Sequence, residues 1–367
     1  MDLYTPVLPI ILPLLIETMG LSYFLAGLVV TVFNVVSSIA QPLVGIYGDK
    51  TGRHADVAFC VLLGSVGISL SALAGNYAVL LALAGGAAIG HALFHPSAME
   101  LVHRMSPPAK RGLYNSIFTT SGSISYALGP VIAGVLIAFA GLPAVVWMIL
   151  PGIIGSAWIF GMSKKAGAYP APAPKSEAFS PTAAGRMNKD AALVVLVCSL
   201  RAWGYIGIIT YLPTFLVLGH FGVNAFTASV VVTVMLFSGV AGQIAGGFLS
   251  DRFGRKQMLV MGLAVSVPCF LLIFSGGMLM YAGILSYAFF ASFCYVTSVT
   301  MSQELLPGKA GLASGLTLGF SLGVGGIGAA LTGLLADISG SLPSALFWLI
   351  IPVAAAPVAA ILITYKR

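Results

Sequence analysis

Uncharged apolar runs of about 20 residues recur along the whole chain, and a run of that length crosses the ~30 Å hydrocarbon core of a bilayer as a helix. Only 7% of the 367 residues are charged, against roughly 25% in soluble domains. The sequence therefore predicts an all-α membrane protein with twelve helices. These are expected at residues 3–19, 24–47, 57–74, 78–101, 112–139, 144–162, 191–217, 226–249, 258–275, 279–302, 311–336 and 344–364.

The basic residues lie almost entirely in alternate loops between these spans. Sixteen of the 17 lysines and arginines fall on one side, and the other loops contain none. Because cytoplasmic loops of membrane proteins are rich in lysine and arginine, this side and the C-terminus are predicted to be cytoplasmic. The net charge of +7 is thus a topology signal, and we expect no nucleic-acid partner.

The longest polar stretch, residues 163–190, is rich in proline, alanine and lysine. This composition is typical of a linker, here on the cytoplasmic side. We therefore expect an N-terminal six-helix bundle at residues 1–162 and a C-terminal one at residues 191–367. The first span is short and contains three prolines, so the printed chain is expected to begin partway through the first helix.

Two motifs repeat across this linker. GIYGDKTGRH (45–54) matches GFLSDRFGRK (247–256) at an offset of 202 residues, and PAKRGL (108–113) matches PGKAGL (307–312) at an offset of 199. Two unrelated motifs that repeat at nearly one offset indicate an internal duplication. The two bundles are therefore predicted to be pseudo-symmetric.

Arg201 is the one basic residue inside an apolar span. It lies 11 residues after Asp190, about 16 Å along a helix, and so near the bilayer centre. An unpaired charge is costly there, so its guanidinium must face a cavity, a carboxylate or a bound anion. An anion-binding role and a structural ion pair both remain open. Tyr205, one turn later, shares its helix face.

His91 and His95 are four residues apart and so share one face of the fourth span. Three interpretations are open: cavity residues that carry protons or bind substrate, ligands of a metal ion, or helix-packing residues. No cysteine or acidic residue precedes Glu100 in that span to complete a ligand set. We therefore expect no metal site, and nothing in the sequence indicates a cofactor.

Acidic and polar residues inside the spans are further candidates. Asp2 is the only acid that can lie deep in the first span, and removal from water favours the protonated form of a carboxyl group, which suits proton exchange. Glu100 and Glu304 are expected near cytoplasmic helix ends, in gate or ion-pair roles. Polar residues that could contact substrate or bond neighbouring helices are Asn34, Gln41, Tyr126, Gln243, Tyr287 and Tyr295.

The duplicated G-x-x-x-D-x-x-G-R loop, together with six helices in each half, resembles the signature of the major facilitator superfamily. In that family the loop closes the cytoplasmic side in the outward-facing state. Its aspartates pair with an arginine and with a helix N-terminus of the opposite half, and its first glycines allow close helix approach. The resemblance gives this gating role to Gly45, Asp49, Arg53, Gly247, Asp251 and Arg255.

A narrower resemblance covers the first, fourth and seventh spans. DLYTPVLPIILPLL (2–15), GLSYFLAGL (20–28), ALFHPSAM (92–99) and the deep arginine together look like the fosmidomycin resistance protein branch of that superfamily. This implies drug export across the inner membrane of a bacterium or archaeon, driven by proton antiport. GSISYALGPVIAG (122–134) looks like the Gly-Pro element of antiporter branches, whose small residues hold the fifth helix against its neighbour.

The sequence contains no pairing of a nucleophile with a base, no phosphate-binding loop and no room in its loops for a catalytic or ATPase domain. The chain is therefore predicted not to be an enzyme but a secondary active transporter. It would work by alternating access around a midplane cavity, as a monomer in the lipid bilayer, and export a small anionic or polar drug-like compound in exchange for protons.

In this hypothesis the candidate substrate-binding residues are Arg201, Tyr205, His91, His95 and Tyr126, and the candidate proton carriers are Asp2, His95 and Glu100. Two alternatives stay open. One is a proton-coupled symporter that takes up an organic anion or a sugar phosphate. The other is a membrane sensor or scaffold that transports nothing.

Overall fold

The computed structural model describes residues 1–51, 54–107, 110–166, 189–219, 221–306 and 310–365. This part of the chain is helical and contains no β-strand. The helices are α1 (Val7–Met19), α2 (Tyr23–Thr51), α3 (Val57–Ser71), α4 (Tyr77–Met105), α5 (Arg111–Ala140), η2 (Leu142–Met148), α6 (Ile149–Ala166), α7 (Lys189–Leu218), α8 (Ala225–Phe253), α9 (Arg255–Leu272), α10 (Gly277–Phe293), α11 (Tyr295–Leu305), α12 (Ala310–Ser314), η4 (Gly315–Phe320), α13 (Ser321–Ser339), α14 (Leu342–Phe347) and α15 (Ile350–Ile361).

Within the described ranges these elements form twelve apolar spans. Ten are long and apolar enough to cross a membrane, and two, α1 and α3, are shorter. Four of the long spans consist of consecutive helical pieces: η2 with α6, α10 with α11, α12 with η4 and α13, and α14 with α15. The prediction of an all-α membrane protein with twelve helices is confirmed.

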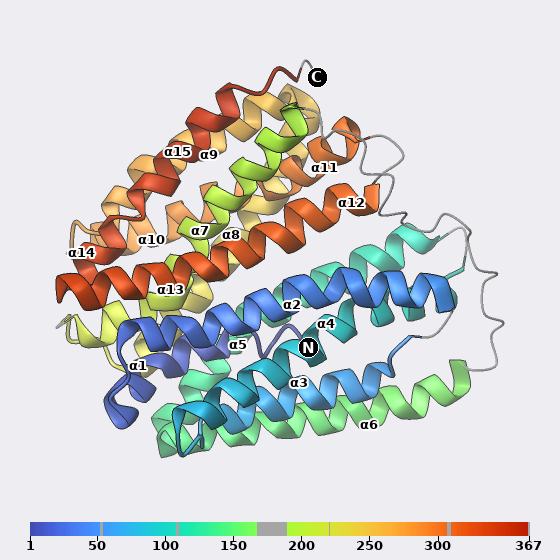
Figure 1. The fold of residues 1–367 in the computed structure, drawn as a ribbon, viewed down its shortest axis with the longest axis horizontal. Helices are drawn as coiled ribbons and strands as arrows, with labels where there is room; N and C mark the ends of the chain where they lie inside the picture. The colour runs from blue at the N-terminus through green and yellow to red at the C-terminus, as the bar shows by residue number, and fades with distance from the viewer. Residues whose placement is uncertain (52–53, 108–109, 167–188, 220, 307–309, 366–367) are drawn as a thin grey trace.

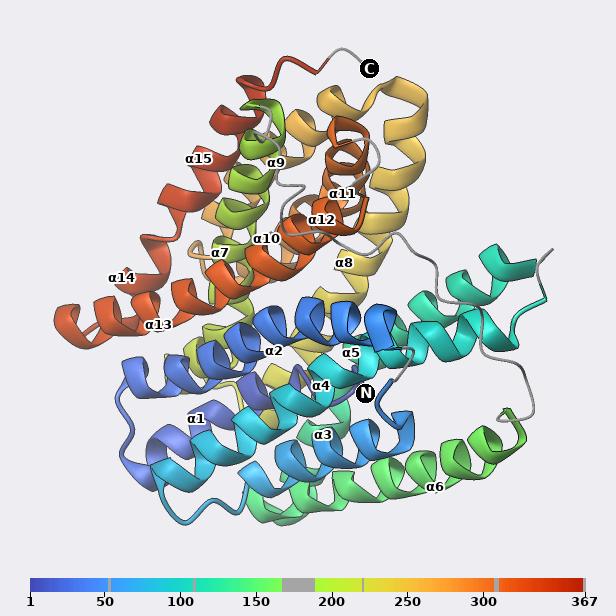
Figure 2. The same ribbon diagram turned by 45° about the vertical axis from the view of Figure 1, so that its right-hand side comes forward.

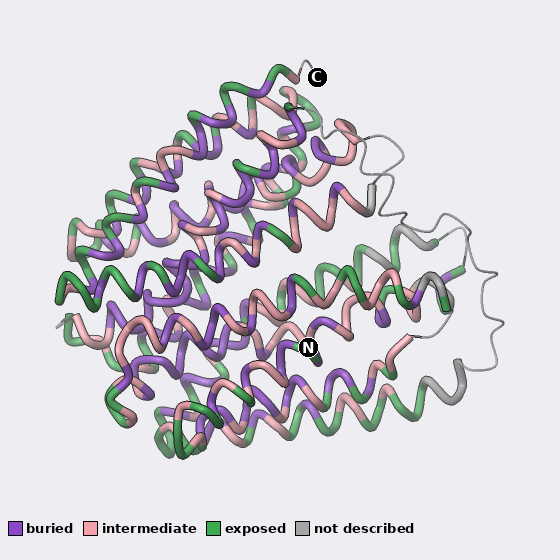
Figure 3. Tube along the Cα trace, in the orientation of Figure 1, coloured by how far each residue is buried: buried purple, intermediate pink, exposed green. Residues whose placement is uncertain are grey.

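Side chains at the ends of several helices bond the free backbone N–H groups that every helix leaves at its start. Asp56, Asn76 and Asn224 each accept a hydrogen bond from the third residue of the helix that follows. Between these ends the outer surfaces are apolar. Phe139 and Met278 are 86% and 83% exposed, and exposed positions recur along the outer helices (Figure 3). A surface of this kind faces lipid.

The helices form two groups, α1 to α6 and α7 to α15 (Figures 1 and 2). They contact each other mainly along α2 with α13, α5 with α8 and α1 with α7. The two groups lie close together at the end of the molecule that holds the turn after α1 and the start of α14. We call this the far end. They diverge toward the end where α6 stops and α7 starts, here called the linker end (Figure 1). Of the expected linker at residues 163–190, residues 163–166 continue α6 and residues 189–190 begin α7. Residues 167–188 lie outside the described part of the chain.

A set of hydrogen bonds joins the two groups at the far end. Both carboxylate oxygens of Asp337, on α13, accept a backbone N–H at the start of α2, from Tyr23 and Phe24, at 2.8 Å each. The hydroxyl of Tyr211, on α7, donates across the groups to the carbonyl oxygen of Tyr23 at 2.7 Å, and it also lies 3.1 Å from the carbonyl oxygen of Ala329 in its own group. A carboxylate at a helix N-terminus satisfies free N–H groups and the helix dipole together. These bonds hold the far end closed.

Candidate functional site

A cavity of about 500 Å³ lies between the two groups of helices. Its walls come from the first residues of the chain and from α1, α2, α4 and α5 on one side, and from α7, α8, α10, α11, η4 and α13 on the other. Most of the lining is apolar, with a small number of polar groups. This is the usual composition of a site for a small molecule.

Arg201 lines this cavity from the middle of α7 and is only 7% exposed. Its Nη1 donates a long hydrogen bond of 3.5 Å to the carbonyl oxygen of Ala291, and its guanidinium lies 5.0 Å from the centre of the Tyr295 ring. Its Nε has no hydrogen-bond partner, and no carboxylate of the described residues lies within 4.0 Å. A buried guanidinium with unused donors is suited to hold an anion.

Three ionisable groups meet on the opposite wall. Asp2 Oδ1 lies 3.3 Å from His95 Nε2 and 3.8 Å from His91 Nε2, and the two Nε2 atoms are 3.2 Å apart. His91 and His95 share one face of α4, as predicted from their spacing. Asp2 comes from the turns that precede α1. We call these three residues the Asp-His-His cluster.

Side chains on α2 hold the His91 ring in place. The hydroxyl of Ser37 lies 2.8 Å from His91 Nδ1, and Gln41 donates to the Ser37 oxygen at 2.9 Å. Phe33, one turn before Ser37, packs on the same ring, with the ring centres 5.5 Å apart. The three α2 residues are spaced at i, i+4 and i+8, so they present one helix face to α4.

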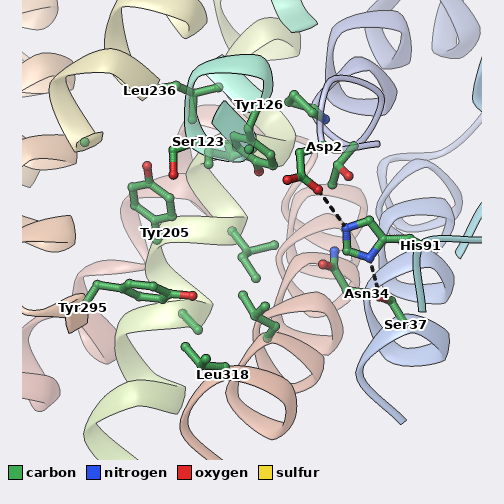
Figure 4. Close-up of a pocket in the computed structure, with 18 of the residues that line it drawn as sticks. Asp2, Asn34, Ser37, His91, Ser123, Tyr126, Tyr205, Leu236, Tyr295 and Leu318 are labelled. Atoms are coloured by element: carbon green, nitrogen blue, oxygen red, sulfur yellow. Dashed lines mark hydrogen bonds and ion pairs between the residues drawn. The ribbon is translucent and has the colours of Figure 1, made fainter. Parts of the chain in front are cut away.

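Tyrosines provide much of the remaining polar lining. Tyr126 on α5, Tyr205 on α7 and Tyr295 on α11 all line the cavity. In Figure 4 Asp2 and His91 point toward each other on one side, and Tyr205 and Tyr295 lie across from them. Rings with one polar atom suit a solute that is partly apolar and partly polar.

Most of the predicted substrate and proton residues therefore come together in one cavity, but Glu100 does not line it. Glu100 lies on α4 and is half-buried. Among the further polar candidates, Asn34, Gln41, Gln243 and Tyr295 line the cavity, whereas Tyr287 is buried. The polar lining residues that sequence reasoning missed are Thr5, Ser37, Ser38, Thr119, Ser123, Thr210 and Ser292. Serine and threonine are common in membrane helices, so the sequence alone does not show which of them lie on a helix face that lines the cavity. The fold determines those faces.

The predicted gating loops lie at the linker end. The side chain of Asp49 and all of Arg53 lie outside the described residues. In the second copy, Arg255 is 3.9 Å from Asp251 but forms a tighter ion pair with Glu304, at 2.9 Å, and Tyr365 donates its hydroxyl hydrogen to the other oxygen of Glu304. The side chain of Asp251 is 77% exposed. Among the described residues, the ion pair of Asp251 is with Arg255 of its own group.

The two gating glycines are not at close helix contacts in this conformation. A Cβ atom added at Gly45 would meet nothing within 4 Å, and one at Gly247 would meet only Val296 Cγ1, at 3.9 Å. The close approach on α8 is one residue earlier. A Cβ at Gly246 would overlap the backbone carbonyl of Phe293 on α10. The close helix approach that the resemblance assigns to these two glycines is therefore absent in this conformation, in which the two groups of helices diverge at the linker end (Figure 1).

This difference between adjacent glycines predicts a difference in stability. Gly246→Ala should lower the thermal unfolding midpoint in detergent by several degrees, because forcing a methyl group against a fixed backbone costs about 1–3 kcal/mol. Gly247→Ala is the matched control, and its midpoint should not fall, because its methyl group meets no atom closer than 3.9 Å and alanine is the better helix former. Equal midpoints for the two variants, measured by intrinsic fluorescence, would contradict the packing of α8 on α10.

Comparison with known proteins agrees with this architecture. A family model described as the Major Facilitator Superfamily matches residues 3–317 and 216–367. The chain is 30% identical over 341 residues to the Fosmidomycin resistance protein of Escherichia coli (strain K12), covering 92% of this chain and 83% of that protein. It is 29% identical over 358 residues to the uncharacterized MFS-type transporter YfnC of Bacillus subtilis (strain 168), covering 96% and 87%.

Solved structures show the same fold at low sequence identity. A bacterial homolog of the human lysosomal transporter Spinster, in an inward-facing and occupied conformation, superposes with a TM-score of 0.80 at 16% identity, covering 99% of this chain and 93% of that chain. The nucleoside transporter NupG superposes with a TM-score of 0.77 at 15% identity, covering 99% and 96%.

Proposed function

Because this chain belongs to the Major Facilitator Superfamily, we propose that it is a secondary active transporter that exports a small anionic compound in exchange for protons. The observation that carries the proposal is Arg201. It is buried, it lines the cavity, and it has no carboxylate partner within 4.0 Å among the described residues. A structural ion pair would satisfy the charge permanently, whereas an unpaired guanidinium gains its partner when an anion binds.

The two groups of helices supply the moving parts. Alternating access is a rocking of one bundle against the other around a fixed central site, and here the bundles are residues 1–162 and 191–367. The far end is held by Asp337 and Tyr211, and the groups diverge at the linker end. With the linker end on the cytoplasmic side, as the basic loops indicate, this conformation is open to the cytoplasm. The signature loops would close that side in the other state.

The Asp-His-His cluster is the proposed site of proton exchange. Asp2 and His95 lie in contact inside the cavity, so a proton can pass between the carboxylate and the imidazole. A proton taken up there changes the charge of the wall opposite Arg201. Glu100, on the same helix toward the linker end, is a further candidate carrier.

The direction and the type of solute follow the similarity to the Fosmidomycin resistance protein of Escherichia coli. The cavity has one cationic group, several tyrosines and an otherwise apolar lining, which suits a phosphonate or carboxylate with a short carbon skeleton. The proposed location is the inner membrane of a prokaryote, with the linker and the C-terminus in the cytoplasm.

Uptake of an organic anion is the second candidate. The chain is 26% identical over 367 residues to the Hexuronate transporter of Bacillus subtilis and 25% identical over 281 residues to a probable sulfoacetate transporter of Cupriavidus necator. Hexuronate and sulfoacetate are anions, so Arg201 would serve them equally well. Uptake would use the same cavity, but protons and solute would then cross the membrane in the same direction.

Flux measurements in proteoliposomes separate these possibilities. With the purified protein and radiolabelled fosmidomycin, a pH gradient that is acidic inside the vesicles should drive accumulation against the solute gradient, since protons leave as solute enters. A gradient that is acidic outside would instead drive accumulation by a symporter. If neither gradient drives accumulation of this solute or of any of a panel of phosphonates and carboxylates, the proposed function is wrong.

A further inference from the structure

The Asp-His-His cluster has a feature that proton exchange does not require. We propose that Asp2, His91 and His95 form a binding site for a divalent transition-metal ion of the Zn²⁺ class in the cavity. The inference rests on the cavity of the proposed transporter, but not on which solute crosses the membrane or in which direction.

The geometry of the three ligand atoms fits such an ion. The separations of 3.2, 3.3 and 3.8 Å among Asp2 Oδ1, His91 Nε2 and His95 Nε2 define a point about 2.0 Å from each atom. Zn²⁺ binds imidazole nitrogen at about 2.0–2.1 Å and carboxylate oxygen at about 2.0–2.2 Å. An ion placed slightly out of the plane of the three atoms would therefore reach all of them without any movement of the backbone.

The surroundings of His91 match what a metal-binding histidine needs. Such a histidine donates its second ring N–H to an acceptor, which fixes the tautomer and the ring orientation. Here Ser37 Oγ lies 2.8 Å from Nδ1, and Gln41 anchors Ser37 at 2.9 Å. With the hydrogen on Nδ1, donated to Ser37, the lone pair of Nε2 points to His95 and Asp2. A serine oxygen can accept from both neighbours at once.

The ligand types select the class of ion. Two imidazole nitrogens and one carboxylate suit Zn²⁺, Co²⁺ or Ni²⁺, while Mg²⁺ and Ca²⁺ prefer oxygen ligands throughout. All three residues line the cavity, so a tetrahedral ion bound there keeps its fourth position for water or for an oxygen of an anionic solute. Catalytic zinc sites have this pattern of three protein ligands and one open position.

The prediction from the sequence that no metal would bind here rested on helix α4 alone. The third ligand comes from a segment about 90 residues earlier in the chain, and only the packing of the N-terminal turns against α4 brings Asp2 to the histidines. The expectation therefore lacked the residue that completes the set.

Metal binding can be measured on the purified protein in detergent, without any solute gradient and after removal of any polyhistidine tag. Calorimetric titration with Zn²⁺ should show one ion bound per chain, and titration with Co²⁺ should give the visible absorption of a tetrahedral site. Asp2→Asn, His91→Gln and His95→Gln should each weaken binding at least tenfold. Ser37→Ala should weaken it roughly tenfold, through the orientation of His91. His54→Gln, a histidine outside the cavity, is the matched control and should bind as the wild type does.

Binding that survives in the His91→Gln, His95→Gln double variant, or that is lost equally in His54→Gln, would overturn the proposal, as would no binding at all. If the cluster variants do not fold, X-ray absorption of the Zn²⁺-loaded wild type decides, because two imidazole ligands are expected and their absence contradicts the site. If Zn²⁺ does not bind, the prediction of proton-driven solute flux is unaffected. Conversely, a protein that accumulates no solute in the flux assay can still bind Zn²⁺. The two proposals therefore fail separately.

Discussion

Arg201→Met is expected to weaken the binding of anionic ligands roughly 10- to 150-fold, the loss associated with hydrogen bonds to a charged group of about 1.5–3 kcal/mol. The unfolding midpoint of the ligand-free protein should stay the same or rise. The reason is that Arg201 is buried with only one long hydrogen bond and a tyrosine ring beside it, so methionine removes a costly desolvated charge and keeps most of the packing.

The measurement is ligand-induced thermal stabilisation by phosphonates and carboxylates, followed by calorimetry on those that bind. Arg201→Lys should retain part of the affinity, because a lysine supplies the charge but not the planar fork of donors. Arg252→Met is the control, since Arg252 is exposed at the end of α8. A large loss of stability in ligand-free Arg201→Met would instead indicate a structural ion pair.

Asp2→Asn is expected to lower proton-driven flux at least tenfold and to lower exchange of labelled for unlabelled solute far less. Exchange needs the solute site but no net proton movement, so only the driven mode depends on a group that gains and loses a proton. His95→Gln should behave in the same way, because His95 lies 3.3 Å from the Asp2 carboxylate.

This experiment compares two modes of transport in the same vesicles and needs a chelator in every buffer, so that no divalent ion occupies the cluster. Glu17→Gln is the matched control, an acid near the far end that does not line the cavity. Driven flux by Asp2→Asn at the wild-type rate would remove Asp2 from the coupling mechanism. Glu100→Gln is measured in the same assay. A loss of proton-driven flux in this variant would show that Glu100, on α4, also takes part in proton coupling.

Much of this fold could be predicted because membrane helices are specified locally. The length of each apolar run sets the span, and the basic loops give a uniform topology signal, so twelve helices follow from the sequence without any knowledge of contacts. Arg201 stood out for the same reason, as one charge in an apolar run. The shared face of His91 and His95 follows from helix periodicity alone.

What could not be predicted depends on contacts between distant segments. Asp2 reaches the two histidines only through packing of the chain start against α4. Asp337 bonds the start of α2 from the opposite group, and no motif around it in the sequence indicates this contact. Arg255 was expected to pair within its motif, and its shorter ion pair is with Glu304. In each case the sequence shows a charge but not the surface that the fold places next to it.

The central claim is that Arg201 holds an anionic solute in the cavity of a transporter. Solute counterflow tests it most directly: proteoliposomes loaded with unlabelled fosmidomycin are diluted into labelled compound, and label uptake is followed with no pH gradient. Wild-type chain should exchange the label, and Arg201→Met of equal thermal stability should exchange it at least tenfold more slowly at solute concentrations well below half-saturation of the wild type. Exchange by Arg201→Met at the wild-type rate would contradict the claim.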